Sequence, residues 1–207
     1  MPIGIPKVPF RLPGEIQPQW IDIYNCLSRE RVLFMTQELE DEITNQLIGL
    51  ILYLSSEVDK QDLFLYINSP GGSVACGLSL VDTIQYIRTD VNTINVGIAA
   101  SMASFVVAGG KQGKRLALPH ARFIIHQPEG RSKGQATEVF AEAQEVIRLR
   151  RTIGQLYSQF TGQPLNRIAA DLDRDEFLNA KQAYNYGLID LVGSNIDSNN
   201  TLNLINS

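Results

Sequence analysis

Histidine and cysteine are scarce in this chain, whose 207 residues include two of each. The cysteines, Cys26 and Cys76, lie far apart and form no CxxC pair, which argues against a disulfide framework and a cysteine zinc site and favours a reducing compartment. A zinc site built from several histidines is disfavoured for the same reason of number. Any reaction that needs an imidazole must use His120 or His126.

The chain also lacks an excess of positive charge and a long apolar run. Its 18 Lys+Arg stand against 22 Asp+Glu, a net charge of −4, which argues against a nucleic-acid partner. The first residues contain four prolines where a secretory signal would need an apolar stretch. Residues 91–110 carry no charge, but they are rich in Gly, Ala and polar side chains. This pattern predicts a buried strand and a buried helix rather than a membrane insertion.

The remaining composition is that of a globular protein. With 44% hydrophobic and 19% charged residues, the length fits one good-sized domain, 19–192. A proline-rich arm, 1–18, precedes it, and a flexible tail with five asparagines, 193–207, follows. Alternating helix and strand patterns predict an α/β fold. Helices are expected at about 41–57, 74–87, 99–108, 135–160, 164–170 and 180–186, and strands at about 62–68, 93–98, 116–118 and 122–126.

Ser101 is the first candidate for chemistry. It stands between Ala100 and Met102, directly after a predicted strand and in the first turn of a predicted helix. Backbone N–H groups at a helix start are unpaired and stabilise negative charge, and the small neighbours let a substrate backbone come close. The alternatives are a helix N-cap or a small buried residue. The surroundings do not match the G-x-S-x-G elbow of the α/β-hydrolases.

His126 ends a predicted strand, where an imidazole can act as a general base toward a serine. A satisfied core histidine is the alternative, and His120, in the turn after Pro119, is expected to be solvated. A catalytic triad also needs a carboxylate that holds the imidazole tautomer. The acidic cluster of residues 171–176, between two short predicted helices, contains several, and the spacing does not say which one is used. A solvated loop is its other interpretation.

A pair of glycines, in the segment Asn68–Ser73, separates a predicted strand from a predicted helix. Glycine permits positive φ and close backbone approach, so free N–H groups can face an anion. The segment fits an oxyanion hole, a docking edge for an extended peptide, a phosphate cradle or a plain turn. It matches neither G-x-x-x-x-G-K-[ST] nor G-x-G-x-x-G, which disfavours nucleotide binding.

Together these segments resemble the Clp protease family of proteolytic subunits, peptidase family S14. The resemblance runs from about Trp20 to Val192, and the opening Met1–Arg11 is similar to the chloroplast-encoded and cyanobacterial branch. It implies a ClpP/crotonase-like α/β fold of repeated β-β-α units with a protruding strand–helix handle at about 130–160. The segments that carry it are Tyr66–Ser73, Ala99–Ala103, Ile125–Pro128 and Asp173–Asp175.

The resemblance implies a serine endopeptidase that hydrolyses unfolded proteins delivered by a AAA+ Clp ATPase. Ser101 matches the nucleophile of the family, His126 its general base and Asp175 its orienting acid, acting through an acyl-enzyme. The backbone N–H groups of Gly72 and Met102 match the oxyanion hole. No metal or organic cofactor is implied, because ATP is used by the partner ATPase.

An assembly is implied as well: two stacked seven-membered rings of this chain, its paralogues or both, in the chloroplast stroma or alternatively in a cyanobacterial cytoplasm. Glu138 and Arg174 match positions that pair across the contact between rings. Tyr66 and Tyr86 match positions in the apolar pocket that docks the ATPase. The arm 1–18 is similar to the axial pore segment of the family.

Two departures from the family pattern bear on substrate preference and partner subunits rather than on catalysis. Ala103 replaces the glycine that usually follows Ser-Met, and Glu129–Lys133 replaces a more glycine-rich handle strand. Other readings are a non-catalytic scaffold subunit of a mixed ring, a crotonase-type acyl-CoA enzyme and a pure interaction module. The complete Ser/His/Asp set favours the protease over all three.

Overall fold

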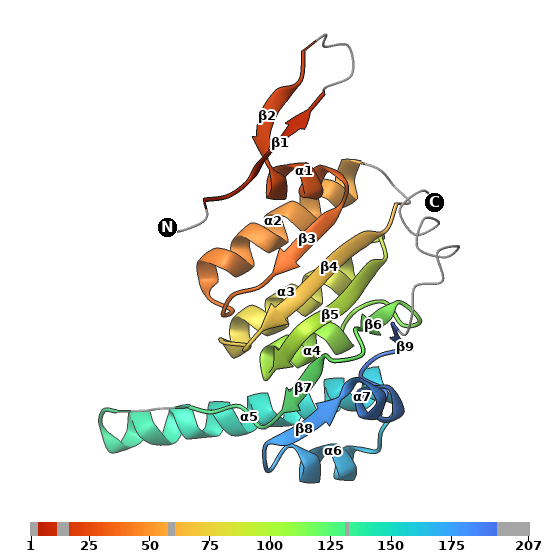
Figure 1. The fold of residues 1–207 in the computed structure, drawn as a ribbon. Helices are drawn as coiled ribbons and strands as arrows, with labels where there is room; N and C mark the ends of the chain where they lie inside the picture. The colour runs from red at the N-terminus through yellow and green to blue at the C-terminus, as the bar shows by residue number, and fades with distance from the viewer. Residues whose placement is uncertain (1–3, 12–16, 58–60, 131–132, 194–207) are drawn as a thin grey trace.

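The structure is a computed structural model that describes residues 4–11, 17–57, 61–130 and 133–193. A seven-stranded sheet forms its centre (Figure 1). Five strands run parallel in the order β3-β4-β5-β6-β9; β7 pairs in parallel with the end of β5, and β8 pairs antiparallel with β7. The strands are β3 (Val32–Met35), β4 (Leu63–Ser69), β5 (Val91–Ala100), β6 (Arg115–Ala117), β7 (Arg122–Ile125), β8 (Glu176–Asn179) and β9 (Leu191–Val192).

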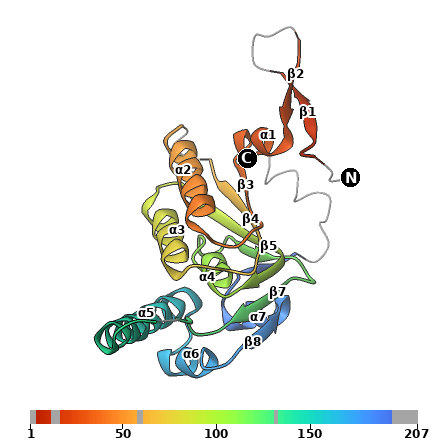
Figure 2. The same cartoon turned by 90° about the vertical axis from the view of Figure 1, so that its left-hand side faces the viewer.

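One face of this sheet is covered by three helices, α2 (Asp41–Glu57), α3 (Val74–Tyr86) and α4 (Met102–Ala108) (Figure 2). The pleat of β4 turns alternate side chains toward them, and Leu63, Leu65 and Ile67 are fully buried. The core therefore lies between the sheet and these helices, and the expected α/β class is confirmed.

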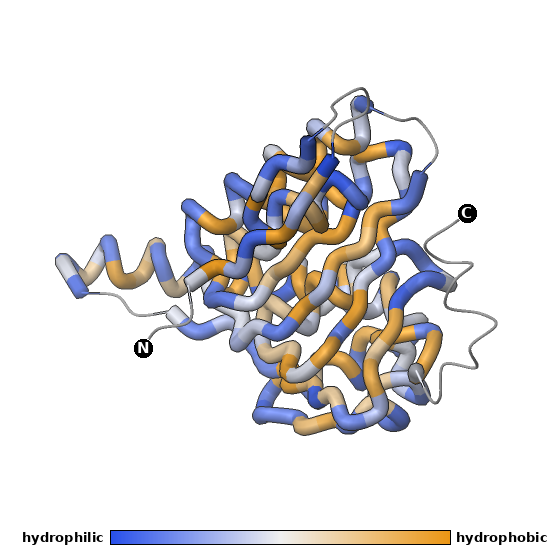
Figure 3. Tube along the Cα trace, turned by 45° about the horizontal axis from the view of Figure 1, so that its top comes forward, coloured by the Kyte–Doolittle hydropathy of each residue, from blue (hydrophilic) through white to orange (hydrophobic). Residues whose placement is uncertain are grey.

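The opposite face is more open. Phe34 and Tyr66 stack there with ring centroids 5.6 Å apart, and Tyr24, from α1 (Ile23–Arg29), meets Phe34 edge-on. Ile98 and Leu191 are exposed. Figure 3 shows apolar residues running along the strands.

The longest helix, α5 (Ala136–Thr161), projects from the body, as Figure 1 shows. A capping box between Gln135 and Glu138 begins it, and Gly162 ends it in a left-handed conformation. Its buried residues, Ile153, Gly154 and Tyr157, all lie in the second half. It corresponds to the helix of the expected handle. In the single chain, 127–130 and 133–135 form no strand beside it, and 131–132 lie outside the described residues.

Two shorter helices, α6 (Leu165–Asp171) and α7 (Ala180–Tyr186), complete the domain. In the expected arm 1–18, β1 (Lys7–Phe10) forms a strand that pairs antiparallel with β2 (Gln19–Asp22), at the start of the domain. Of the expected tail, 194–207 lie outside the described residues. Within the described ranges, no helix is both long and apolar enough to cross a membrane.

The expected helices α2, α3 and α7 form with bounds within one residue of the prediction. One prediction is wrong in its position: residues 99–100 belong to the end of β5, and α4 begins only at Met102. The elements absent from the prediction are α1, β1, β2, β3, β8 and β9, all of two to seven residues. Such short strands are held by pairing with distant segments, so their own sequences carry little periodic signal.

Candidate active site

Ser101 occupies the junction between β5 and α4 in a strained backbone conformation, φ 53° and ψ −126°. In the described part of the chain it shares a positive φ with one other non-glycine residue, Arg31. Such a conformation persists only where the surroundings enforce it. Here the Ser101 N–H donates to the carbonyl oxygen of Ile124 on β7, at 2.8 Å. The sharp strand-to-helix turn therefore presents the serine as a nucleophile elbow does, without that motif.

The glycine pair lies directly against this turn. Gly71 has φ +94°, and a Cβ at this position would lie 2.5 Å from the Ala100 carbonyl oxygen and 2.8 Å from the Ser101 Cβ. Gly72 has φ +151°, and its Cβ would collide with the backbone of Leu39. Backbone bonds fix the loop, since the Leu39 N–H donates to Gly71 and the Ser73 N–H donates to Leu39, at 2.8 and 2.9 Å. Only glycine allows the approach to Ser101.

Two backbone donors beside Ser101 are unpaired. In the part of the chain that the structure describes, neither the Gly72 N–H nor the Met102 N–H donates a hydrogen bond. Met102 begins α4, where N–H groups have no partner within the helix. The Cβ position of Gly71 is 3.0 Å from the Met102 nitrogen, so the glycine loop and the helix start are adjacent. Paired donors of this kind can stabilise an oxyanion.

His126 and Asp175 come together through the pairing of β7 and β8. The last pair in the antiparallel register is Ile125 with Glu176, so His126, directly after β7, and Asp175, directly before β8, lie at the same end of this strand pair. His126 is half-buried and Asp175 is exposed. The Ser101 N–H donates to Ile124, two residues before His126. Ser101, His126 and Asp175 therefore lie at the same end of the strands β5, β7 and β8.

The imidazole of His126 has its own partner in the single chain. Its Nδ1 lies 2.8 Å from the carbonyl oxygen of Gln127. A carbonyl only accepts, so Nδ1 carries the proton and Nε2 keeps its lone pair. Within the described residues, no hydrogen bond joins His126 to Ser101 or to Asp175. The structure thus gathers the three residues but does not link them.

The acidic cluster separates into engaged and free carboxylates. Asp171 accepts a hydrogen bond from the Tyr186 hydroxyl at 2.7 Å, and Asp173 forms an ion pair with Arg150 of α5. Asp175 has no ion pair or hydrogen bond to another described residue. The pairing of β8, which local sequence could not reveal, therefore brings this free carboxylate to the end of β7 that carries His126.

The two other predicted pairs are separated within one chain. Glu138 caps the projecting end of α5 through the Gln135 N–H, at 3.1 Å, and forms no ion pair with Arg174 in the described part of the chain. Tyr66 lies on the open face of the sheet, whereas Tyr86 ends α3 on the covered face and is 85% exposed. Any contact between the members of either pair would need a second chain.

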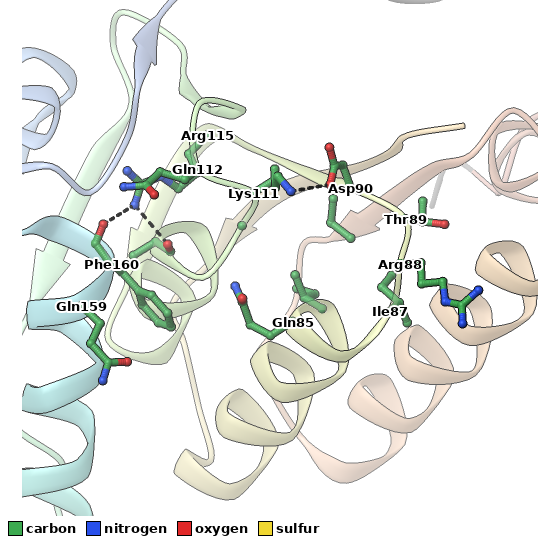
Figure 4. Close-up of a pocket in the computed structure, with 14 residues that line it drawn as sticks. Gln85, Ile87, Arg88, Thr89, Asp90, Lys111, Gln112, Arg115, Gln159 and Phe160 are labelled. Atoms are coloured by element: carbon green, nitrogen blue, oxygen red, sulfur yellow. Dashed lines mark hydrogen bonds and ion pairs between the residues drawn. The ribbon is translucent and has the colours of Figure 1, made fainter. Parts of the chain in front are cut away.

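Two cavities among the described residues lie apart from Ser101. One of about 340 Å³ lies between the end of α3, the start of β5 and the end of α5 (Figure 4), and another of about 450 Å³ lies between α5 and α6. Two cations of the first are bound by neighbouring groups: Lys111 binds Asp90 at 2.9 Å, and Arg115 donates to the Phe160 carbonyl at 2.8 Å. Ser101 lines neither cavity, and the first lies at the opposite end of β5 from it. Among the described residues, no cluster of His, Cys, Asp or Glu could hold a metal ion.

Comparison with known proteins gives a consistent family. Residues 14–195 match the family described as Clp protease. The "ATP-dependent Clp protease proteolytic subunit" of Oltmannsiellopsis viridis is 63% identical over 94% of this chain and 100% of that protein. Proteins of the same name from Chlorella vulgaris and Marchantia polymorpha are 61% and 54% identical, over 93% and 98% of this chain and 96% and 99% of their own lengths. The resemblance seen in the motifs is confirmed, and the chain belongs to the Clp protease family.

Proposed function

We propose that this chain is a serine endopeptidase subunit in which Ser101 is the nucleophile, His126 the general base and Asp175 the orienting acid. One observation carries the proposal: a serine held at φ 53° stands next to two unpaired backbone donors, the N–H groups of Gly72 and Met102. A strained serine beside paired donors is the arrangement that acyl transfer requires.

The reaction follows from these positions. Ser101 Oγ attacks the peptide carbonyl carbon while His126 Nε2 takes its proton. The carbonyl oxygen becomes an oxyanion that accepts from the Gly72 and Met102 N–H groups, each contributing about 3 kcal/mol of transition-state stabilisation. Collapse expels the amine, which takes its proton from His126, and water then releases the acyl group by the same steps. The proposed reaction needs no metal or organic cofactor.

Alignment of the triad requires one movement of His126. Its Nδ1–H now donates to Gln127, and in the proposed active arrangement it donates to Asp175, which directly precedes β8. The tautomer is the same in both arrangements, so turning the ring needs no proton exchange. Since the Gln127 N–H is held by the Leu172 carbonyl at 2.8 Å, the backbone beside the imidazole stays in place.

The relatives' name, ATP-dependent Clp protease proteolytic subunit, supports a working partnership with a Clp ATPase and an oligomeric assembly. Apolar side chains on the projecting half of α5, Phe140 and Ile147 among them, are exposed in the single chain. Exposed apolar surface of this kind is typical of an interface. We place this half of α5, with Glu138 and Arg174, at the contact between two stacked seven-membered rings of this chain, its paralogues or both.

Docking of the ATPase is assigned to the open face of the sheet at Tyr66, together with Tyr86 of a neighbouring subunit. Both carry exposed or half-buried aromatic rings that their own chain leaves without full cover. Because the relatives come from green algae and plants, we propose the chloroplast stroma as the compartment.

Labelling with a fluorophosphonate tests the catalytic assignment. Ser101→Ala in the assembled protein is expected to lose both the label and the hydrolysis of a fluorogenic peptide. The control is Ser73→Ala, which removes an exposed hydroxyl of the glycine loop that makes no capping bond and should leave both intact. An unlabelled wild type would favour the non-catalytic scaffold subunit, and labelling of the Ser101→Ala protein would overturn the assignment.

A further inference from the structure

A second serine and a tyrosine stand behind the nucleophile. The Ser104 hydroxyl donates to the Ser101 carbonyl oxygen at 2.7 Å, and the same oxygen accepts the N–H groups of Ser104 and Phe105 at 3.1 and 3.4 Å. The Tyr157 hydroxyl, from α5, lies 2.7 Å from Ser104 Oγ. Ser104 is 0% exposed and Tyr157 is 3% exposed, so these bonds are shielded from water.

The direction of each hydrogen bond is fixed by chemistry. The Ser101 carbonyl oxygen can only accept, so it uses the one hydrogen of the Ser104 hydroxyl. Tyr157 must then be the donor to Ser104 Oγ. Burial raises the pKa of Tyr157 far above its usual value, more than the hydrogen bond to Ser104 lowers it, so the phenol keeps its proton. The protons therefore run from Tyr157 to Ser104 and from Ser104 to Ser101.

These two hydrogen bonds, from Tyr157 to Ser104 and from Ser104 to Ser101, fix the direction of the Met102 N–H. The Ser101 carbonyl and the Met102 N–H belong to one planar trans peptide unit, so they point in opposite directions. Any group that holds the carbonyl oxygen in the protein interior also holds the N–H toward the substrate side. The peptide unit between Ser101 and Met102 has to be held in this orientation, because relaxation of the strained Ser101 backbone would rotate it.

The ring of Tyr157 is held separately from its hydroxyl. It meets Phe105 of α4 edge-on, with ring centroids 5.3 Å apart and planes at 79°, and Phe160 adds a second ring contact to Phe105. Removing the hydroxyl alone would leave this packing in place. The hydroxyl of Tyr157 therefore contributes separately from the ring, through its hydrogen bond to Ser104, its partner in the described part of the chain.

We propose that Ser104 and Tyr157 are positioning residues that aim the Met102 N–H at the oxyanion. This inference rests on the proposed serine protease function and adds a specific role to two residues outside the triad. It predicts a loss of transition-state stabilisation with little effect on substrate binding in the ground state.

The test compares Tyr157→Phe, Ser104→Ala and the double variant in the assembled protein. Active sites are counted with a fluorophosphonate, so each kcat refers to labelled serine. Both single variants are expected to lower kcat about 10-fold with an unchanged KM, less than the 10²–10³-fold cost of removing a donor outright. Affinity for a peptide boronate, whose tetrahedral adduct resembles the transition state, should fall by the same factor. The double variant should lose no more than Ser104→Ala, because Tyr157 acts through Ser104.

Thr93→Val is the matched control. Its buried hydroxyl donates to the Val107 carbonyl at 2.8 Å, a bond to the same helix α4 at the end away from Ser101. This variant should lose thermal stability as the others do, with kcat per labelled site unchanged. If Tyr157→Phe behaves like Thr93→Val, the hydroxyl is merely structural and the inference is overturned. A wild type that binds neither the fluorophosphonate nor the boronate would instead overturn the proposed function, and the inference with it.

Discussion

The two ends of β5 differ in how far their polar groups have hydrogen-bond or ion-pair partners. At the Ala100 end, Ser101 is strained, two backbone N–H groups are unpaired and the predicted triad is gathered but not bonded. At the Val91 end, ion pairs are frequent: Lys111 and Lys114 bind Asp90 at 2.9 and 3.1 Å, and Asn92 donates to Asp62 at 3.0 Å. The exception there is Arg31, whose Nη2 is buried without a hydrogen-bond partner among the described residues.

The buried guanidinium of Arg115 completes the paired end. It binds Asp190 at 2.6 Å and donates to the carbonyl oxygens of Ala108 and Phe160, so the β6 strand is tied to α4, α5 and the segment before β9. The two unpaired backbone N–H groups that we propose as oxyanion donors lie at the Ser101 end, where a substrate would complete them. The ion pairs at the Val91 end contribute to stability, so the two ends can be varied separately.

His126→Ala should have the largest effect and act on the strained end alone. Loss of the general base is expected to lower kcat for peptide hydrolysis roughly 10³-fold, about 4 kcal/mol of barrier. Thermal stability should change little, because the half-buried ring makes one hydrogen bond, to Gln127. His120→Ala, in an exposed turn, is the control and should keep full activity. Comparable losses in both variants would contradict the assignment of His126.

Asp190→Asn should have the converse effect, about 3 kcal/mol of lost unfolding free energy with kcat per labelled site unchanged. The reason is that Arg115, with a side chain 4% exposed, would be left as a buried charge without its counter-ion. Chemical denaturation of the assembled protein measures the loss. Asp90→Asn is the control, and because its pairs are partly exposed we expect less than about 1 kcal/mol. Equal losses would show that the two pairs do not differ as their burial suggests.

Gly71→Ala separates close contact from backbone strain. The added Cβ would push into the Ala100 carbonyl and Ser101, so kcat should fall about 100-fold, as small misplacements at reacting groups cost. Gly113→Ala also has a positive φ, +87°, but meets open space at the paired end. It should lose about 1 kcal/mol of stability from strain and no activity per site. An active Gly71→Ala protein would mean that the glycine loop does not shape the site.

The smallest expected effect is on the unfolding free energy at acidic pH. Burial alone would raise the pKa of Asp190, but the hydrogen bonds and charge of Arg115 outweigh it, and the pKa lies below its usual value. A carboxylate with a lowered folded pKa contributes stability at neutral pH that is lost as the pH falls below about 4. Asp190→Asn should therefore flatten the pH dependence of the unfolding free energy below about pH 4. Parallel curves for the two proteins would contradict this origin.

Local sequence was sufficient for the long elements and for the turn that carries Ser101, whose role as nucleophile came from the family resemblance. It was insufficient for the way distant segments meet. The small-residue turn around Ser101 and the periodic stripe of α5 are readable because helix starts and helical faces leave a pattern over adjacent residues. Asp175 could not be chosen from its neighbours by spacing, since its place depends on the register between β7 and β8. Tyr157 lies beside that stripe, but nothing local joins it to Ser104, which is 53 residues away.

The packing of the projecting half of α5 depends on the concentration of the protein. The helix has 26 residues and is therefore about 39 Å long, and its own chain buries only the second half. In the assembly proposed above, a neighbouring chain covers the first half, so association and the packing of this segment depend on the same free energy. Dilution would then lower the local stability of the first half of α5 as well as separate the subunits.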